Sequence, residues 1–220
     1  MRVGIMQPYL LPYIGYFQLI EYCDAFVIYD DIEYTKRGWI NRNRILASGA
    51  PSTFTVPLAK APDATLVRER TIADAFNPRK LLAQFAGAYR GSPYWSEHEE
   101  WLRAVIEDAE RNLFGYIRNA LHATLALISI ETEVIVSSDL HIEDGARGQD
   151  KVLAICKATG ADEYVNPIGG TQLYESAAFA AAGVHLSFLQ SRLSPYPQPV
   201  EVFVPALSIV DMLMELSVDG

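Results

Sequence analysis

The amino-acid sequence predicts an α/β fold with a mostly parallel, Rossmann-like sheet and helices on both faces. Short apolar runs alternate with segments of helical spacing at both ends of the chain, which is typical of strand–helix–strand units. The middle of the chain shows only helical spacing. We therefore expect the 220 residues to form a single α/β domain, with a mainly helical insertion at about residues 76–130.

The N-terminal part of the chain is expected to form a strand, a helix and a second strand. Arg2–Met6 is a short apolar run closed by Gln-Pro, residues 13–22 have helical spacing, and residues 25–29 form another apolar run. Because such a short crossover joins parallel neighbours, these two strands are expected to pair in parallel. Residues 53–58 alternate between apolar and polar side chains, which predicts a third strand.

The centre of the chain is predicted to be helical, and strand–helix alternation returns after it. Pro78 and the Gly91-Ser92-Pro93 break divide the centre into about three helices. Gly160 and Gly183 follow helical patterns where C-caps occur. The later expected elements are strands at 133–136, 163–165 and 184–189, and helices at 149–159, from the Gly-Gly loop to about 182, and at 207–216.

Composition and charge exclude several classes of protein. Half the residues are apolar and 11% are aromatic, which indicates a globular chain. The net charge is −9 without a basic stripe, which argues against nucleic-acid binding. The first residues lack signal-peptide features and no apolar run nears the ~18–20 residues of a membrane span, so we expect a cytoplasmic protein without membrane insertion. Cys23 and Cys156 predict neither a structural disulfide nor a zinc site, and no metal-ligand spacing appears.

Candidate functional residues follow from the rule that ligands bind beyond the carboxyl ends of the strands in an open α/β sheet. Four segments satisfy this rule: residues 7–16, 30–43, 166–171 and 191–203. They lie far apart in sequence, but the predicted fold brings the ends of their strands together.

The second segment, YDDIEYTKRGWINRNRI, has the highest density of polar side chains. Asp30 and Asp31 could position an amine or act as a general base, with a pKa raised by the neighbouring carboxylate. Arginine forks suit phosphate groups, and asparagine both donates and accepts hydrogen bonds. The alternative is a salt-bridged loop that fastens the second strand to the helical layer. The candidate ligand-binding residues here are Arg37, Trp39, Asn41, Arg42 and Asn43.

The Asn166-Pro-Ile-Gly-Gly loop lies between an expected strand and an expected helix. Gly169 and Gly170 would allow a ligand to approach the backbone, and the following helix start would favour an anion. The alternative is a tight turn capped by Asn166. His185, on the last strand, is either a general base of near-neutral pKa or a hydrogen-bonded core residue.

Three other features have mainly structural interpretations. Cys23 is flanked by acids and is expected to be a packed thiol rather than a nucleophile. Asp211 lies in an apolar helical pattern, where Ser208 or an arginine could be its partner. The Tyr196-Pro-Gln-Pro stretch is either a stiff connector or a wall of the ligand cleft.

The sequence resembles the WbqC-like protein family over nearly its whole length, in the order of that family's motifs. The stretches that carry the resemblance are IMQPYLLPYIGYFQLI, DAFVIYDDIEYTKRGWINRNRI, ICKATGADEYVNPIGG and FVPALSIVDML. Genes of this family occur in clusters for O-antigen and related glycan synthesis. The resemblance therefore implies an enzyme that attaches an acyl or aminoacyl group to a sugar amine.

The stretch Tyr13-Ile14-Gly15-Tyr16 resembles, more distantly, the HIGH signature of nucleotidyltransferases with both histidines replaced by tyrosine. The position after the first strand and the glycine agree with that signature. The chemistry does not agree, because tyrosine hydroxyls stay neutral near pH 7 whereas histidine can carry charge onto a phosphoryl group. The resemblance supports a Rossmann-like fold more than adenylyl transfer.

These observations lead to one principal hypothesis and two alternatives. The principal one is an acyl- or aminoacyltransferase that forms an amide on an amino sugar, with an acyl or aminoacyl thioester on CoA or a carrier protein as co-substrate and no firmly implied cofactor. A diphosphate would bind Arg37 and Arg42, and tyrosine or asparagine donors would hold the oxyanion. The alternatives are a nucleotidyltransferase-like enzyme and a non-catalytic sugar-nucleotide-binding subunit. The candidate catalytic residues are Asp30, Asp31, Tyr16 and His185, and the candidate substrate-binding residues are Gln7, Tyr9, Tyr13, Arg37, Trp39, Asn41, Arg42, Asn43, Asn166, Gly169 and Gly170.

Overall fold

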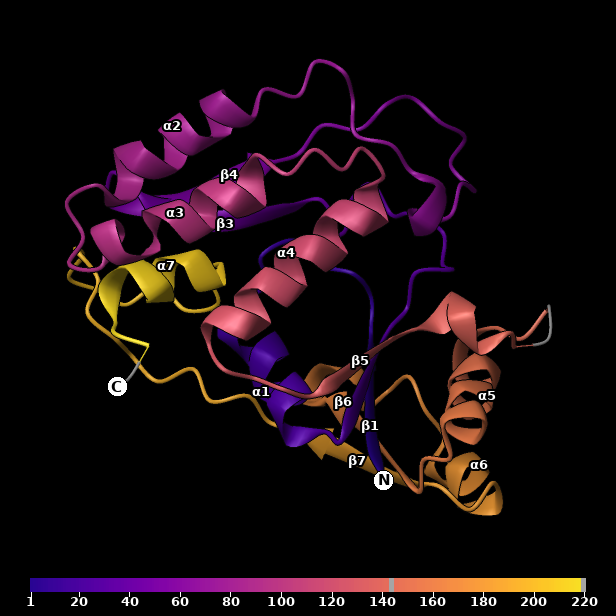
Figure 1. Cartoon of the computed structure of the whole chain (residues 1–220). Coiled ribbons are helices and arrows are strands. Elements are labelled where there is room, and N and C mark those ends of the chain that lie inside the picture. The colour runs from indigo at the N-terminus through magenta and orange to yellow at the C-terminus, as the bar shows by residue number, and fades with distance from the viewer. Residues whose placement is uncertain (143–144, 219–220) are drawn as a thin grey trace. The chain divides into compact units, whose positions relative to one another are not determined.

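The structure is a computed structural model that describes residues 1–142 and 145–218 (Figure 1). The chain divides into two compact units. The first contains Met1–Gln7, Gly15–Ile32 and Ile130–Arg192, and the second contains Pro8–Ile14, Glu33–Ser129 and Leu193–Gly220. That these units behave as a single domain stays a prediction.

The first unit is built on a five-stranded sheet in which all neighbouring strands are parallel. The strand order is β5-β2-β1-β6-β7. The chain therefore adds strands on one side of β1 and then returns to add strands on its other side, which is the Rossmann-like arrangement that the sequence predicts. The strands are β1 (Arg2–Met6), β2 (Ala25–Ile28), β5 (Glu133–Val136), β6 (Glu163–Pro167) and β7 (His185–Leu189).

Helices cover both faces of this sheet, also as predicted (Figure 1). Because side chains alternate along a strand, Val3 and Ile5 of β1 pack in one core with residues of α5 (Gly148–Thr159) and α6 (Ser176–Ala181). Gly4 points to the other face, where a Cβ would lie 3.0 Å from the Cys23 sulfur and 3.4 Å from Leu19. The absent side chain at position 4 thus lets α1 (Ile14–Tyr22) pack closely on the sheet.

The register aligns the carboxyl ends of three strands. Met6 of β1 pairs with Ile28 of β2, which pairs with Val136 of β5. The residues that follow these strands therefore leave the sheet at the same edge. Between β1 and β6 the chain connections diverge, and this switch point is where open α/β sheets bind ligands.

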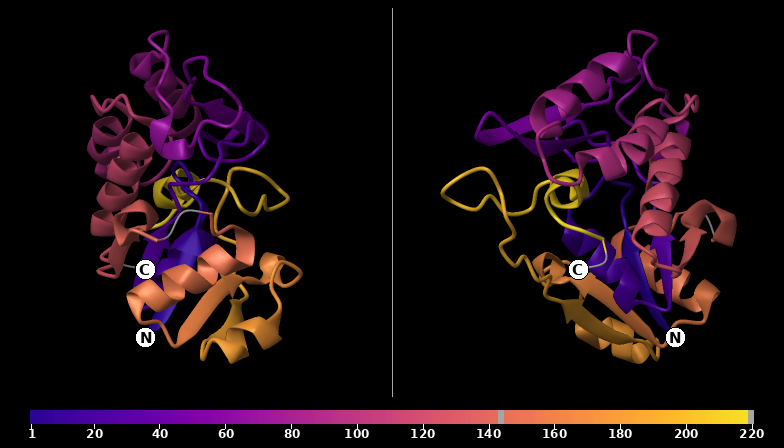
Figure 2. Two further views of the ribbon diagram at one scale, coloured as in Figure 1. Left: turned by 90° about the vertical axis from the view of Figure 1, so that its right-hand side faces the viewer. Right: turned by 60° about the vertical axis from the view of Figure 1, so that its left-hand side comes forward.

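The second unit combines a β-hairpin with four helices among the described residues. Figure 2 shows the hairpin beside α2, and the ring centroids of Phe54 on β4 and Phe85 on α2 lie 4.9 Å apart. The expected three central helices are confirmed. The elements are β3 (Arg42–Ala47), β4 (Ala50–Thr55), α2 (Pro78–Tyr89), α3 (Trp95–Ile106), α4 (Leu113–Leu127) and α7 (Ile209–Glu215), with short 3₁₀ turns elsewhere, including η1 (Val67–Glu69).

Two parts of the predicted element map differ from the structure. Residues 42–47, which the sequence suggests are partly loop, form strand β3, and the strand expected at 53–58 is its antiparallel partner β4 rather than part of the parallel sheet. The expected loop at 166–170 contains a 3₁₀ turn, η3 (Ile168–Gly170), and the helix expected from that loop to about residue 182 is the shorter α6, which begins only at Ser176. Both stretches are short, and tertiary pairing outweighs local pattern in short elements.

Helix ends follow the local signals in the sequence. Asn77 caps α2 by accepting a hydrogen bond from the Lys80 amide at 3.0 Å, and Pro78 occupies the first helical position. Gly160 ends α5 in the left-handed conformation, at φ 70°, as expected for its C-cap. No helix of the described residues is long and apolar enough to span a bilayer.

Candidate functional site

Two of the predicted segments flank the switch point of the parallel sheet. Gln7 follows β1 and is exposed, while Asn166 lies near the end of β6 and is buried. Gly169 and Gly170 form the 3₁₀ turn that leaves β6. Because Arg2 to Gly4 pair in register with Glu163 to Val165, the two strands end at the same level. The structure therefore brings Gln7 and the Asn166 loop to one edge.

Gly170 is required by the packing of Asn166. A Cβ at position 170 would overlap the Asn166 side-chain amide, whereas a Cβ at Gly169 would meet nothing within 4 Å. The Tyr164 hydroxyl lies 3.1 Å from the Asn166 Oδ1 atom and 3.1 Å from the Tyr174 hydroxyl. The Asn166 side chain is thus held in the fold and does not cap the 3₁₀ turn, while Gly169 is exposed at the sheet edge.

Asp30 and Asp31, at the carboxyl end of β2, lie against a turn that follows β5. This turn is η2 (Ser137–Leu140). The Asp30 Oδ1 atom accepts a hydrogen bond from the Ser138 amide (3.0 Å) and lies 2.9 Å from the Ser137 hydroxyl oxygen, and its Oδ2 atom accepts a hydrogen bond from the Ser138 hydroxyl (2.8 Å). Asp30 is 2% exposed. Its carboxylate therefore fixes the turn, which leaves Asp31 as the more accessible acid.

Asp31 forms an ion pair with Lys151 on α5 and accepts a 2.6 Å hydrogen bond from the Ser137 hydroxyl. Burial raises the pKa of the Asp31 carboxyl, but the hydrogen bonds from Lys151 and Ser137 outweigh burial, so its pKa is lowered. The expectation that the neighbouring carboxylate raises this pKa is wrong for Asp31, because the ammonium of Lys151 decides the balance. The Lys151 Nζ atom also lies 5.1 Å from the centroid of the Tyr29 ring, so a carboxylate and an aromatic ring together surround one ammonium group.

The other two catalytic candidates of the first unit, Tyr16 and His185, have different surroundings. Tyr16 is 3% exposed, donates a 3.0 Å hydrogen bond to the Gln7 carbonyl, and packs edge-on against Phe26. Burial raises the pKa of its hydroxyl. His185 is exposed at the first residue of β7, paired with Glu163 at the start of β6, and thus lies at the amino edge of the sheet, opposite the acids.

The two cysteines are buried in the first unit, and neither forms a disulfide. Burial raises the pKa of the Cys23 thiol to about 12 and that of the Cys156 thiol to about 11. A thiol with such a pKa is almost entirely protonated near neutrality and is a poor nucleophile.

In the second unit, two predicted binding residues hold the backbone instead. The Asn41 amide donates to the Val56 carbonyl at 2.8 Å, and the Asn43 amide donates to the Leu11 carbonyl at 2.6 Å. Both side chains are buried. The Tyr9 hydroxyl donates to the Asn43 Oδ1 atom at 3.1 Å, and burial raises the pKa of Tyr9 to about 12. These residues position the N-terminal segment of this unit on β3.

The other predicted residues of this segment are accessible. Trp39 is 43% exposed, and the ζ carbon of Arg42 lies 5.4 Å from the centroid of its ring. Arg44, which the sequence analysis did not single out, lies at 5.6 Å from the same ring. The Arg37 carbonyl accepts a 2.7 Å hydrogen bond from Arg42, and Arg37 and Tyr13 are at least partly exposed.

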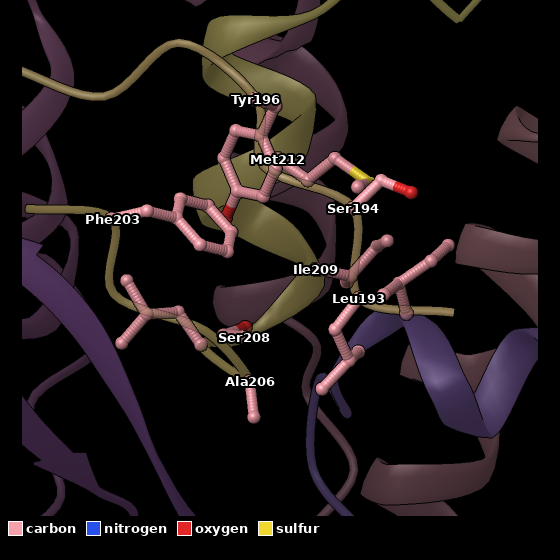
Figure 3. A pocket seen from close by; sticks show the side chains of 10 residues that line it. Leu193, Ser194, Tyr196, Phe203, Ala206, Ser208, Ile209 and Met212 are labelled. Atoms are coloured by element: carbon pink, nitrogen blue, oxygen red, sulfur yellow. The ribbon is translucent and has the colours of Figure 1, made fainter. Parts of the chain in front are cut away.

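The C-terminal segment of the second unit contains a buried carboxylate and a small pocket. Asp211 is fully buried and accepts hydrogen bonds from the Tyr89 hydroxyl (2.6 Å), the Tyr196 hydroxyl (2.6 Å) and the Gln198 amide (2.8 Å). Among the described residues, the partners of the Asp211 carboxylate are therefore two tyrosines and a glutamine rather than Ser208 or an arginine. Figure 3 shows Tyr196 and Phe203 beside Met212 in the wall of the pocket. Tyr196 of the Tyr-Pro-Gln-Pro stretch thus lines a pocket, and Tyr196 and Gln198 tie the stretch to α7.

Comparison with known proteins places this chain in a family. A model of the WbqC-like protein family matches residues 7–220. The chain belongs to the WbqC-like protein family. It is also similar to Rv1507c, an uncharacterized protein of Mycobacterium tuberculosis, with 29% identity over 222 residues that cover 100% of this chain and 95% of the relative. No solved structure matches the chain.

Each of the two units of this WbqC-like protein contains candidate residues that the sequence analysis did not single out. Ser137, Ser138 and Lys151 complete the environment of the acidic pair, and Arg44 adds a second guanidinium beside Trp39. Only the spacing of Arg42 and Arg44, two residues apart on a strand, could have indicated a shared face. Within residues 1–142 and 145–218, no group of three His, Cys, Asp or Glu side chains is arranged to hold a metal ion.

Proposed function

We propose that this WbqC-like protein transfers an acyl or aminoacyl group from a thioester to the amine of an amino sugar, with a nucleotide-linked amino sugar as the expected acceptor. The observation that carries the proposal is the environment of the Lys151 ammonium group. The Asp31 carboxylate, at the ligand edge of the sheet, and the Tyr29 ring both lie beside this ammonium. The same chemistry recognises the amine of a sugar. The family resemblance supplies the expectation of an amino-sugar acceptor in surface-glycan or related biosynthesis.

The reaction requires one bond to form and one to break. The neutral amine nitrogen attacks the thioester carbonyl carbon, a C–N bond forms, and the C–S bond then breaks. The thiolate that leaves is a stronger base than a carboxylate and takes the proton that the amine loses. No nucleophilic side chain is needed, which agrees with the buried, protonated state of Cys23 and Cys156.

In this proposal the two acids have different roles. Asp31 holds the amine, because its lowered pKa keeps it ionised and makes it a weak proton acceptor. Asp30 orients the Ser137–Ser138 turn beside it. Gln7, exposed at the switch point, is the candidate donor to the oxyanion that forms during attack.

The test is to incubate the protein with UDP- or dTDP-linked amino sugars and a panel of acyl- and aminoacyl-CoA thioesters, and to measure amide product by mass spectrometry and released thiol by absorbance. We expect amide and thiol in equal amounts. Asp31→Asn should lower the rate at least about tenfold, whereas Asp139→Asn, which removes an exposed carboxylate from the same turn, should not. Absence of amide across the panel, including carrier-protein thioesters, would overturn the proposal.

The same experiment distinguishes the alternatives. A sugar nucleotide that binds but is never modified would favour a non-catalytic binding subunit. The nucleotidyltransferase alternative is disfavoured, because the Tyr16 hydroxyl at the HIGH-like turn is buried and bonded to the Gln7 carbonyl. Pyrophosphate release from ATP or CTP would nevertheless revive that alternative.

A further inference from the structure

One face of strand β3 presents two half-buried arginines beside one indole ring. Arg42 and Arg44 are two residues apart on the strand, so their side chains leave on the same face. Their ζ carbons lie 5.4 and 5.6 Å from the centroid of the Trp39 ring, and Trp39 is 43% exposed. We call Trp39, Arg42 and Arg44 the hairpin cluster.

The positive charges of the hairpin cluster have no ion-pair partner among the residues that the structure describes. Within the described part of the chain, neither guanidinium forms an ion pair with a carboxylate, although the chain has 27 acidic and 18 basic residues. Two neighbouring arginines without a carboxylate partner create a local positive potential on an acidic protein.

Hydrogen bonds to backbone carbonyls hold these charges in place. The Arg42 Nε atom donates to the Gly38 carbonyl at 2.8 Å, and one of its terminal nitrogens donates to the Arg37 carbonyl at 2.7 Å. Arg44 makes a longer contact, 3.4 Å, with the Ala206 carbonyl. Neutral carbonyls orient a guanidinium without cancelling its charge, so the cluster is preorganised for an anion.

We propose that the hairpin cluster binds a diphosphate, the anionic group that a nucleotide-linked sugar and coenzyme A share. Two guanidinium forks can each contact one phosphate, and they match phosphate geometry better than lysine does. The exposed edge of Trp39 offers an apolar surface for the sugar or nucleoside next to that diphosphate. The inference rests on the proposed function only for the choice of ligand, because binding can be measured without turnover.

The test measures binding of pyrophosphate, UDP, dTDP and CoA by calorimetry, with pantetheine as a ligand without a diphosphate. We expect every diphosphate to bind and pantetheine not to bind. Arg44→Gln should weaken binding about tenfold or more, and affinity should fall as salt is raised. Arg79→Gln, which removes an exposed positive charge on α2, is the matched control and should bind as the wild type does.

The different ligands and variants show which co-substrate supplies the diphosphate, and they test the two proposals separately. Tighter binding of UDP or dTDP assigns the cluster to the acceptor, and tighter binding of CoA assigns it to the donor. Equal affinity of wild type and Arg44→Gln would overturn the inference, as would an equal loss in Arg79→Gln. If Arg44→Gln does not fold, the second readout is the quenching of Trp fluorescence by UDP. We expect this quenching in the wild type and its loss in Trp39→Phe. Unchanged quenching in Trp39→Phe would overturn the inference. Arginine-dependent binding without amide formation would support the diphosphate site and contradict the proposed function. Amide formation that Arg44→Gln does not change would support the proposed function and contradict the diphosphate site.

Discussion

Lys151 on α5 forms an ion pair with Asp31, 120 residues away in sequence, and only 14% and 16% of the two side chains are exposed. The pair ties the helix to the edge of the sheet where the proposed amine site lies. Its partial burial makes the interaction stronger than a surface ion pair and makes the loss of one partner more costly.

We predict that Asp31→Asn and Lys151→Met each lower the free energy of unfolding by about 1–3 kcal/mol at pH 7, because each leaves a partly buried polar group without its partner. The double variant should lose less than the sum of the single losses. Urea unfolding of the four proteins measures the coupling between the two residues. Strict additivity would show that the two side chains do not interact.

The same pair predicts how stability depends on pH. The pKa of Asp31 is lower in the folded protein than the ordinary value of about 3.9. Its stabilising contribution is therefore complete above pH ~3.9 and is lost as the pH falls through the lower folded pKa. Wild type and Asp31→Asn should accordingly differ in stability at pH 7, and the difference should shrink as the pH is lowered below ~3.9, as followed by urea unfolding at each pH.

Gly170 should not tolerate a side chain. Gly170→Ala is expected to cost about 1–3 kcal/mol of unfolding free energy, because the new methyl group overlaps the Asn166 amide. Gly169→Ala, its neighbour with open space, should stay within about 0.5 kcal/mol of the wild type. Addition of Asn166→Ala to Gly170→Ala should recover part of the loss, and equal effects of the two glycine variants would contradict this packing.

Asp211 should be among the most sensitive positions of the second unit. Asp211→Asn is expected to lower the unfolding free energy by about 2–4 kcal/mol, because an amide nitrogen would then face hydrogen-bond donors in a buried site. Tyr196→Phe, which removes one donor, should cost only about 1 kcal/mol. Guanidinium unfolding curves compare the variants, and a neutral Asp211→Asn would mean that this network does not contribute to stability.

The thiols of Cys23 and Cys156 should be unreactive in the folded protein. With pKa values of about 12 and about 11, they are almost wholly protonated at pH 8, and both are buried. Iodoacetamide should therefore add no mass to the native protein. It should add two carbamidomethyl groups to the protein unfolded in about 6 M guanidinium, which unfolds most domains. Rapid labelling of one native thiol would point to a nucleophilic cysteine after all.

Tyr16→Phe and His185→Ala test the other two catalytic candidates of the first unit. Tyr16→Phe should lose about 0.5–1.5 kcal/mol of stability with its hydrogen bond to the Gln7 carbonyl and keep its rate of amide formation. His185→Ala should leave both properties unchanged, because the side chain is exposed at the opposite edge of the sheet. If either variant forms amide much more slowly without losing stability, the substituted residue takes part in catalysis.

The sequence by itself determined the fold class and most helix and strand positions. Apolar runs of strand length identified β1, β2 and β5, and local signals such as Asn77 and Gly160 acted at helix ends. These features depend on residues that are close in the chain, so they can be predicted without a structure. The family motifs are equally local.

Only the tertiary structure decided which polar groups meet. It paired Asp31 with Lys151, bound Asp30 to the Ser137–Ser138 turn, and buried Asn41 and Asn43 against backbone carbonyls. It also made β3 a strand, so that Arg44 joins Arg42 beside Trp39. The physical reason is that the pKa and accessibility of a side chain depend on neighbours brought close by strand order and packing, which no local pattern of residues specifies.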